Sequence, residues 1–181
     1  LNDNAVLGIA MGTSEAGGYV DPSGNITGWL NELAFAPVDF SKDAMIDEWS
    51  GDIGCGVKYF SQDGVIKLAP AAGIELDEAL SPAEKLKVIQ GLMKEGNPLA
   101  RQIYEDIGTY LGYTLPFYAM FYDIKHILLL GRVTSGEGGN IVMDRANQVL
   151  AEEFPEYSFR VALPDENNRR VGEQIAAASL A

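Results

Sequence analysis

Cysteine, histidine and basic residues are scarce in this sequence of 181 residues. The single cysteine, Cys55, excludes an internal disulfide bond and is typical of a protein of the reducing cytoplasm. The single histidine, His126, has no base or nucleophile beside it in the sequence, so we assign it no catalytic role. The 13 Lys and Arg residues face 26 Asp and Glu residues, for a formal charge of −13. This acidity argues against nucleic acid and anionic membranes as partners.

Long apolar runs and clustered metal ligands are also missing. No apolar segment approaches the roughly 20 residues of a transmembrane helix, and no secretory signal opens the chain. The sequence begins at Leu1 without methionine, so we expect a cut or processed product. The acids between Asp39 and Gly56 lack the spacing of a calcium loop, and Cys55 has no histidine near it. We therefore expect no bound metal.

The chain does contain an apolar strand, Ala5–Met11, that ends in the small residues Gly12, Thr13 and Ser14. Gly17-Gly18 follow, and a second strand is expected to begin at Tyr19. Backbone N–H groups of such a turn can face an anion, because glycine removes the Cβ atoms that would block close approach. An ordinary hairpin with a glycine-rich tip explains the same residues.

The next segments predict a third strand and two helices. Asp21–Asn25 has the composition of a tight turn and leads to a strand at Ile26–Leu30. Ser81–Glu84 has the pattern of a capping box, so a helix should run from there to about Lys94. A long core helix should start at Asn97-Pro98, since apolar residues recur every four positions at Leu99, Ile103, Ile107, Leu111 and Leu115.

The last third alternates strands and helices. Four consecutive aliphatic residues, Ile127–Leu130, predict a strand that is buried on both faces. A glycine-rich loop, a helix, a strand and an alanine-rich helix should follow at Arg132–Asn140, Ile141–Glu153, Tyr157–Leu163 and Val171–Ala181. This order predicts a single α/β domain over residues 1–181, with a mixed sheet of antiparallel N-terminal strands and parallel strands covered by helices.

Two glycine turns at strand ends, about 120 residues apart and separated by a long helix, resemble the second lobe of the actin-like ATPase and sugar-kinase superfamily. Within it, the chain resembles the ROK family of sugar kinases and sugar-responsive repressors. The resembling segments are Gly12–Gly18 (the Gly-Thr-Gly-x-Gly-Gly-Gly phosphate turn), Trp29–Phe35 (Gly-Glu-x-Gly-His), Gly51–Cys55 (the end of a zinc motif), Asn97–Met120 (the long helix), Leu128–Ser135 (the adenosine turn) and Val171–Ala181 (the closing helix). The resemblance implies a ribonuclease H-like lobe.

The resemblance also implies roles for individual residues. Gly12, Thr13 and Ser14 would face the β- and γ-phosphates of ATP, which this family uses with Mg²⁺. Glu32 would lie near a sugar hydroxyl group. The residues near adenosine would be Gly131, Arg132, Val133 and Thr134.

The zinc and sugar motifs depart from the family pattern. Phe35 stands where the motif has histidine. Glu48 and Ser50 stand at the first two zinc cysteines, and Cys55 alone matches the third. Val57 replaces the acid that follows that cysteine in sugar-binding members. We therefore expect no structural zinc.

The phosphate turn and the catalytic base also depart. Ser14 and Ala16 replace glycines, and Glu15 would add a negative charge beside the phosphates. The family's base is the Asp of an Asn-Asp pair at the end of the first lobe. Asn2-Asp3 imitates this pair, but Asp3 stands only nine residues before Gly12, where a helix and a strand normally intervene. The resemblance thus implies that the first lobe is absent from this chain.

Two hypotheses follow. In the first, the chain is the ATP-binding half of a ROK-like sugar kinase, inactive without its first lobe and paired as a homodimer through its exposed apolar surface. In the second, it is a non-catalytic binding or regulatory domain that kept the fold and lost the kinase site. The ROK repressors carry a DNA-binding module, which this acidic sequence lacks.

Overall fold

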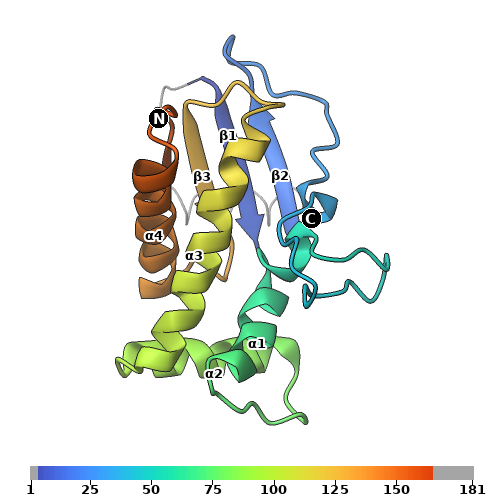
Figure 1. Cartoon of the computed structure of the whole chain (residues 1–181), viewed down its shortest axis with the longest axis vertical. Coiled ribbons are helices and arrows are strands. Elements are labelled where there is room, and N and C mark those ends of the chain that lie inside the picture. Colours follow the sequence, from blue (N-terminus) through green and yellow to red (C-terminus); the bar gives the residue numbers. More distant parts are fainter. Residues whose placement is uncertain (1–3, 165–181) are drawn as a thin grey trace, which may run out of the picture.

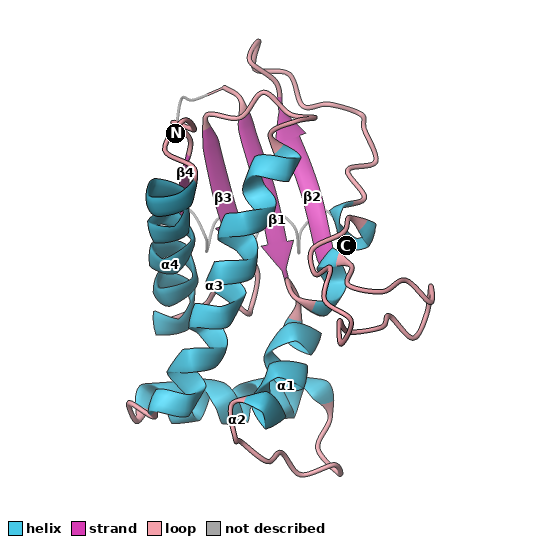
Figure 2. Cartoon of the chain, in the orientation of Figure 1, coloured by secondary structure: helices cyan, strands magenta, loops and turns pink. Residues whose placement is uncertain are grey.

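The structure is a computed structural model that describes residues 4–164. These residues form a four-stranded sheet with helices packed against one face (Figures 1 and 2). The strands β1 (Val6–Met11), β2 (Glu15–Val20), β3 (His126–Leu130) and β4 (Arg160–Ala162) lie in the order β2-β1-β3-β4. β2 is antiparallel to β1, whereas the β1–β3 and β3–β4 pairs are parallel. The predicted mixed α/β sheet is therefore confirmed.

The helices start where their capping residues predict. Ser81 and Glu84 form a reciprocal capping box before α2 (Pro82–Lys94), and the Asn97 side chain accepts hydrogen bonds from the first backbone N–H groups of α3 (Pro98–Tyr118). Pro116 does not end α3, which continues for two more residues. The remaining helices are η1 (Leu33–Phe35), η2 (Gly56–Lys58), α1 (Gln62–Ala71) and α4 (Glu137–Glu153), where η marks a 3₁₀ turn. No helix in the described part of the chain could span a bilayer.

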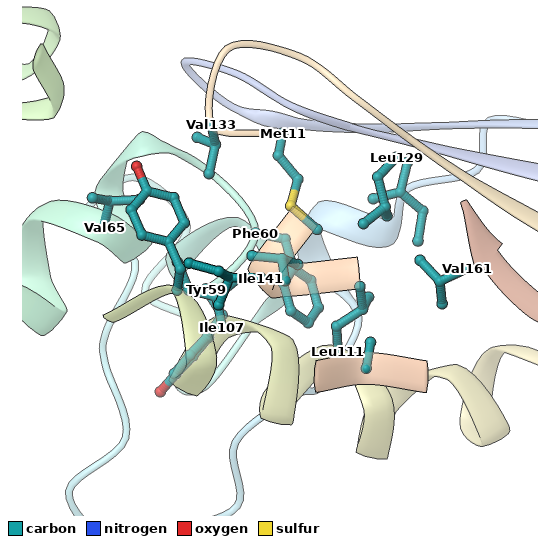
Figure 3. Close-up of a cluster of buried hydrophobic side chains, with 14 of the residues drawn as sticks. Met11, Tyr59, Phe60, Val65, Ile107, Leu111, Leu129, Val133, Ile141 and Val161 are labelled. Atoms are coloured by element: carbon teal, nitrogen blue, oxygen red, sulfur yellow. The ribbon is translucent and has the colours of Figure 1, made fainter. Parts of the chain in front are cut away.

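The core lies between the sheet and the helices. Alternate residues of β1 and β3 point into it and meet the apolar face of α3 and side chains from α1 and α4 (Figure 3). Ile107 and Leu111 of α3 are fully buried, whereas Leu99, at the start of the predicted stripe, is 44% exposed. β3 alternates between buried and half-buried residues, so the expectation of burial on both faces was wrong. Within residues 4–164, helices cover only one face of the sheet, so the side chains on the other face of β3 stay partly exposed.

Four predicted elements also differ from the structure, and one of them is β4, which covers Arg160–Ala162 rather than Tyr157–Leu163. β2 begins at Glu15, so Gly17-Gly18 lie inside the strand rather than in the turn. Ile26 makes only an isolated bridge to Val20, and no third strand forms over Ile26–Leu30. α4 begins within the predicted loop, at Glu137. Both Asp3 and the expected helix at Val171–Ala181 lie outside the described residues.

Candidate functional site

The turn between β1 and β2 is short and held firmly in place. Gly12 N donates to Ser14 O at 3.0 Å, and the Gly12 carbonyl oxygen accepts a hydrogen bond of 2.8 Å from Gln62 N at the start of α1. The side chains of Thr13 and Ser14 are exposed. The turn thus presents two hydroxyl groups at the carboxyl end of β1.

The loop that follows β3 is fixed to the same end of the sheet. Gly131 has a φ angle of +95°, and a Cβ atom there would overlap the backbone of Met11, so only glycine fits without strain. Val133 N donates to Met11 O at 3.1 Å. The side chain of Gln90 in α2 donates to the Arg132 carbonyl oxygen at 3.0 Å. The loop is therefore attached to both β1 and α2.

The two turns meet through their side chains. Arg132 Nη2 donates a hydrogen bond of 3.0 Å to Thr13 Oγ1, across 119 residues of sequence. The contact forms because parallel neighbours β1 and β3 end at one edge of the sheet, the lower edge in Figure 1. The two turns therefore share one rim, and the rim combines two hydroxyl groups with an exposed guanidinium group.

A cavity of about 270 Å³ lies beside this rim, between α2 and the start of α4. Tyr104 of α3 contributes a buried hydroxyl group near Gln90, without a hydrogen bond of normal geometry. Burial raises the pKa of Tyr104, so its hydroxyl group stays protonated near neutral pH. The cavity is slightly smaller than typical ligand pockets, which start at roughly 300 Å³. Its lining residues are Gln90, Met93, Lys94, Tyr104, Ser135, Gly136, Glu137 and Gly138.

The start of α4 forms one wall of the cavity. Gly136 precedes the helix with a φ angle of +70° and provides no side-chain cap. A Cβ atom on Gly138 would overlap the ring of Tyr104, so glycine allows the helix to approach the aromatic ring. Uncapped N–H groups at a helix start favour polar or anionic ligand atoms.

Glu15 does not stand beside the rim, contrary to our expectation. It is the first residue of β2, and its side chain points into the protein, where it is only 5% exposed. Desolvation by burial raises the pKa of Glu15 to about 8, so the carboxyl group is mostly neutral at pH 7. The rim is therefore spared the negative charge that the sequence pattern predicted.

Glu32 lies on the flank of the same end of the sheet. The chain returns along β2 towards the turn, with Thr27 N donating to Tyr19 O at 3.0 Å. A Cβ atom on Gly17 would overlap the Asn31 carbonyl oxygen, so the returning segment lies directly on the strand. Glu32, next to Asn31, is exposed. Its role in sugar binding stays a prediction.

Val133 and Thr134 are present in the loop but their side chains point inward. Both are fully buried, and Thr134 Oγ1 donates to the Gly131 carbonyl oxygen at 3.0 Å. Only backbone atoms of these two residues could contact a ligand. The glycine pattern predicted a turn after β3, but it could not predict which side chains of that turn are buried.

Ion pairs hold the segment that resembles a zinc motif. Glu48 stands where the family's zinc motif has its first cysteine. Its carboxylate pairs with Lys58 at 2.7 Å and with Lys67 at 2.5 Å. Burial is the main reason that the pKa of Cys55 is raised, which leaves an unreactive thiol. Among residues 4–164, no cluster of His, Cys, Asp or Glu could hold a metal ion.

Sequence reasoning missed the cavity itself. Gln90 and Lys94 belong to an ordinary amphipathic helix in the sequence, and Tyr104 fits the core stripe of α3. The sequence signal that could have pointed to them was the pair Gly138-Gly139 opposite a predicted helix. Such a pair indicates close packing but not its partner.

No family model matches the sequence, and no curated protein matches it. Several solved structures match over most of the chain. A ROK family glucokinase from Streptomyces griseus in complex with glucose and AMPPNP has 18% identity and a TM-score of 0.68, covering 90% of this chain and 56% of its own. The ROK hexokinase from Thermus thermophilus has 15% identity and a TM-score of 0.66, covering 91% and 53%. A ROK family transcriptional regulator, a homolog of the E. coli MLC protein, has 19% identity and a TM-score of 0.67, covering 87% and 41%.

The chain therefore has the fold of the actin-like ATPases. Within that fold, the three structures described above are two ROK sugar kinases and a ROK transcriptional regulator, so the family resemblance seen in the sequence motifs is confirmed in the fold. The chain spans about half the length of the two kinases.

Proposed function

We propose that the chain is the nucleotide-binding lobe of a ROK-like sugar kinase, which transfers the γ-phosphate of ATP to a sugar hydroxyl group once a first lobe completes the site. The observation that supports this most directly is the hydrogen bond between Arg132 and Thr13, which joins two glycine turns beside a cavity. Phosphoryl transfer depends mainly on positioning and on neutralising phosphate charge. Donors on a fixed rim suit both tasks.

The geometry suggests a place for each part of the nucleotide. Gly12, Thr13 and Ser14 would face the β- and γ-phosphates, and Arg132 would offset their charge in a chain of formal charge −13. The adenosine would occupy the cavity, where polar groups come from α2, α3 and the start of α4. The rim offers hydroxyl groups but no carboxylate, so Mg²⁺ would be held mainly by phosphate oxygens and water, as is usual for this ion.

The chain should not turn over alone. Phosphoryl transfer requires the sugar, the base and the nucleotide to be brought together as two lobes close. From this lobe only Glu32 would contact the sugar, and the base would come from the first lobe. Asp3 remains a candidate base by sequence alone.

A non-catalytic regulatory domain is the second candidate. Ser14 and Ala16 replace two glycines of the turn, and Phe35 replaces a sugar-contacting histidine of the motif. The same fold also occurs in a ROK transcriptional regulator, so the fold does not require catalysis. Loss of nucleotide binding would favour this candidate.

Isothermal titration calorimetry with ATP–Mg²⁺ tests the proposal. We expect micromolar binding, and we expect Arg132→Ala to weaken it at least tenfold. Arg101→Ala is the matched control, because Arg101 is an exposed arginine whose ion pair within residues 4–164 is with Glu105 on α3, at 2.8 Å. No heat of binding in the unmodified chain, or equal affinities of the two variants, would contradict the proposal. A hexose panel with ATP–Mg²⁺ should give no steady ADP release from this chain alone.

We also propose that the chain pairs as a homodimer in the cytoplasm. Trp49 is 84% exposed and lies with its ring centroid 5.9 Å from that of Phe35. Ile46 and Ile53, which bridge to each other nearby, are more than half exposed. Apolar groups gathered on one loop are typical of a protein interface.

A further inference from the structure

The carboxyl group of Glu15 is buried beneath the phosphate turn without a partner. Both of its oxygen atoms lack a hydrogen bond within residues 4–164. A Cβ atom on Gly56 of η2 would overlap both Glu15 Oε2 and the Leu33 carbonyl oxygen of η1, so the carboxyl group fills the space where β2, η1 and η2 meet. Buried polar groups in proteins are nearly always hydrogen-bonded, and an exception calls for an explanation.

Within residues 4–164, Glu15 makes no ion pair that would stabilise an anion. From α3, the Tyr118 hydroxyl group is also buried and unpartnered, and burial together with Glu15 raises its pKa. From η2, the ammonium group of Lys58 is engaged by three carboxylates of other segments. Glu32, which directly precedes η1, is exposed. A neutral carboxyl group is therefore the form that this packing accepts.

An ionised Glu15 could reach water only if its neighbours separated. Asn31 and Leu33 already lie in direct contact with Gly17 of β2, and Gly56 N donates to Ala36 O at 2.9 Å, which ties η2 to the same segment. No room remains for hydration between these elements. Ionisation would therefore displace residues 31–36 and disturb the turn Gly12–Ser14, which directly precedes Glu15.

We propose that Glu15 is a protonation-dependent latch: while its carboxyl group is neutral, residues 31–36 stay packed against β2 beside the phosphate turn, and its ionisation releases them. The latch makes Glu15 a positioning residue for Gly12–Ser14 on one side and for Glu32 on the other. The release of residues 31–36 is independent of what the turn binds. The consequence for nucleotide affinity rests on the proposed function.

Tryptophan fluorescence tests the release. Trp49→Phe leaves Trp29, which precedes the latched segment and stacks on Tyr19 of β2 with ring centroids 5.6 Å apart. Between pH 6 and pH 10 we expect one fluorescence transition with a midpoint near 8, the pKa of Glu15, and none in the Trp49→Phe, Glu15→Gln variant. A transition of the same midpoint in the Gln variant, or none in the Glu15 protein, would overturn the latch.

A titration of the wild-type protein tests the latch even if the Gln variant misfolds. Carbon NMR of Glu-labelled wild-type protein reads the Glu15 carboxyl directly, and a pKa of 4 to 5, the ordinary range for glutamate, would refute the latch. ATP–Mg²⁺ affinity should fall at least tenfold from pH 7 to pH 9 in the wild type but not in Glu15→Gln. If neither protein binds ATP at pH 7 while the fluorescence transition is present, the proposed function fails and the latch stands.

Discussion

Lys58 joins the segment that contains Asp47 and Glu48 to the start of α1 through ion pairs. We therefore expect its replacement to lower the free energy of unfolding. Its side chain is 4% exposed, and Nζ lies 3.0 Å from Asp47, 2.7 Å from Glu48 and 3.0 Å from Asp63 at the start of α1. Burial alone would lower the pKa of Lys58, but hydrogen bonds to these three carboxylates outweigh it and raise the pKa. Lys58 is therefore charged at every physiological pH.

Lys58→Met keeps much of the side chain's length and removes the charge. Breaking a buried ion pair from one side costs about 3–5 kcal/mol. Most of this should come from Asp47, whose side chain is 8% exposed and would be left unpaired. Glu48 is 70% exposed, so its loss should contribute at most about 1 kcal/mol. We expect the free energy of unfolding, from urea denaturation followed by circular dichroism, to fall by about 4 kcal/mol with an unchanged m-value.

Lys67→Met is the matched control, because Lys67 is 30% exposed and, in the part of the chain that the structure describes, makes an ion pair with Glu48 alone. It should cost about 1 kcal/mol or less. Adding Asp47→Asn to Lys58→Met should recover part of the loss, since the stranded buried charge is removed. Equal losses for Lys58→Met and Lys67→Met, or no recovery in the double variant, would refute this reasoning.

Two other predictions concern the rim and the surface. Gly131→Ala should lower the free energy of unfolding by about 2 kcal/mol, because it combines a strained backbone with overlap of Met11. Gly73→Ala has a similar φ angle of +84°, but its Cβ atom would make only an ordinary contact with Leu99, and by urea denaturation it should cost about 1 kcal/mol. Trp49→Asp should dissociate the proposed homodimer in sedimentation velocity, whereas Met120→Asp, a comparable change at a residue that is 73% exposed, should leave it intact. A wild-type monomer at all accessible concentrations would remove the dimer proposal.

Local signals predicted the starts of two helices well. The Ser81 capping box and the Asn97 cap specify their own hydrogen bonds within a few residues, so the starts of α2 and α3 could be read directly from the sequence. The expected strand at Ile26–Leu30 failed for the opposite reason. Strand pairing depends on a partner elsewhere, and Ile26 and Leu30, both 85% exposed, have no buried face to specify a register.

The site was predictable only in part because its side chains are arranged by tertiary packing. Glycines marked both turns in the sequence, although only Gly131 allows a close backbone approach, to Met11 of β1; a Cβ atom on Gly12 would make just an ordinary contact with Ser14 O. The direction of Glu15 depended on where β2 begins, and a shift of that start moved the side chain from the rim to the core. The hydrogen bond from Gln90 to the Arg132 carbonyl oxygen depends on how α2 packs against the rest of the fold. The sequence of α2 alone does not predict that packing.

The position of the rim follows from one feature of the topology, the parallel pairing of β1 with β3. An antiparallel β3 would have carried Arg132 to the opposite edge and left Thr13 facing solvent alone. A parallel neighbour requires a long crossover, and here α1, α2 and α3 supply it. That crossover also brings Gln90 and Tyr104 to the cavity, so the same connection that aligns the two turns builds the wall beside them. The two glycine turns lie far apart in the sequence because the helices between them are needed to make β3 parallel to β1, and this parallel pairing brings the turns together.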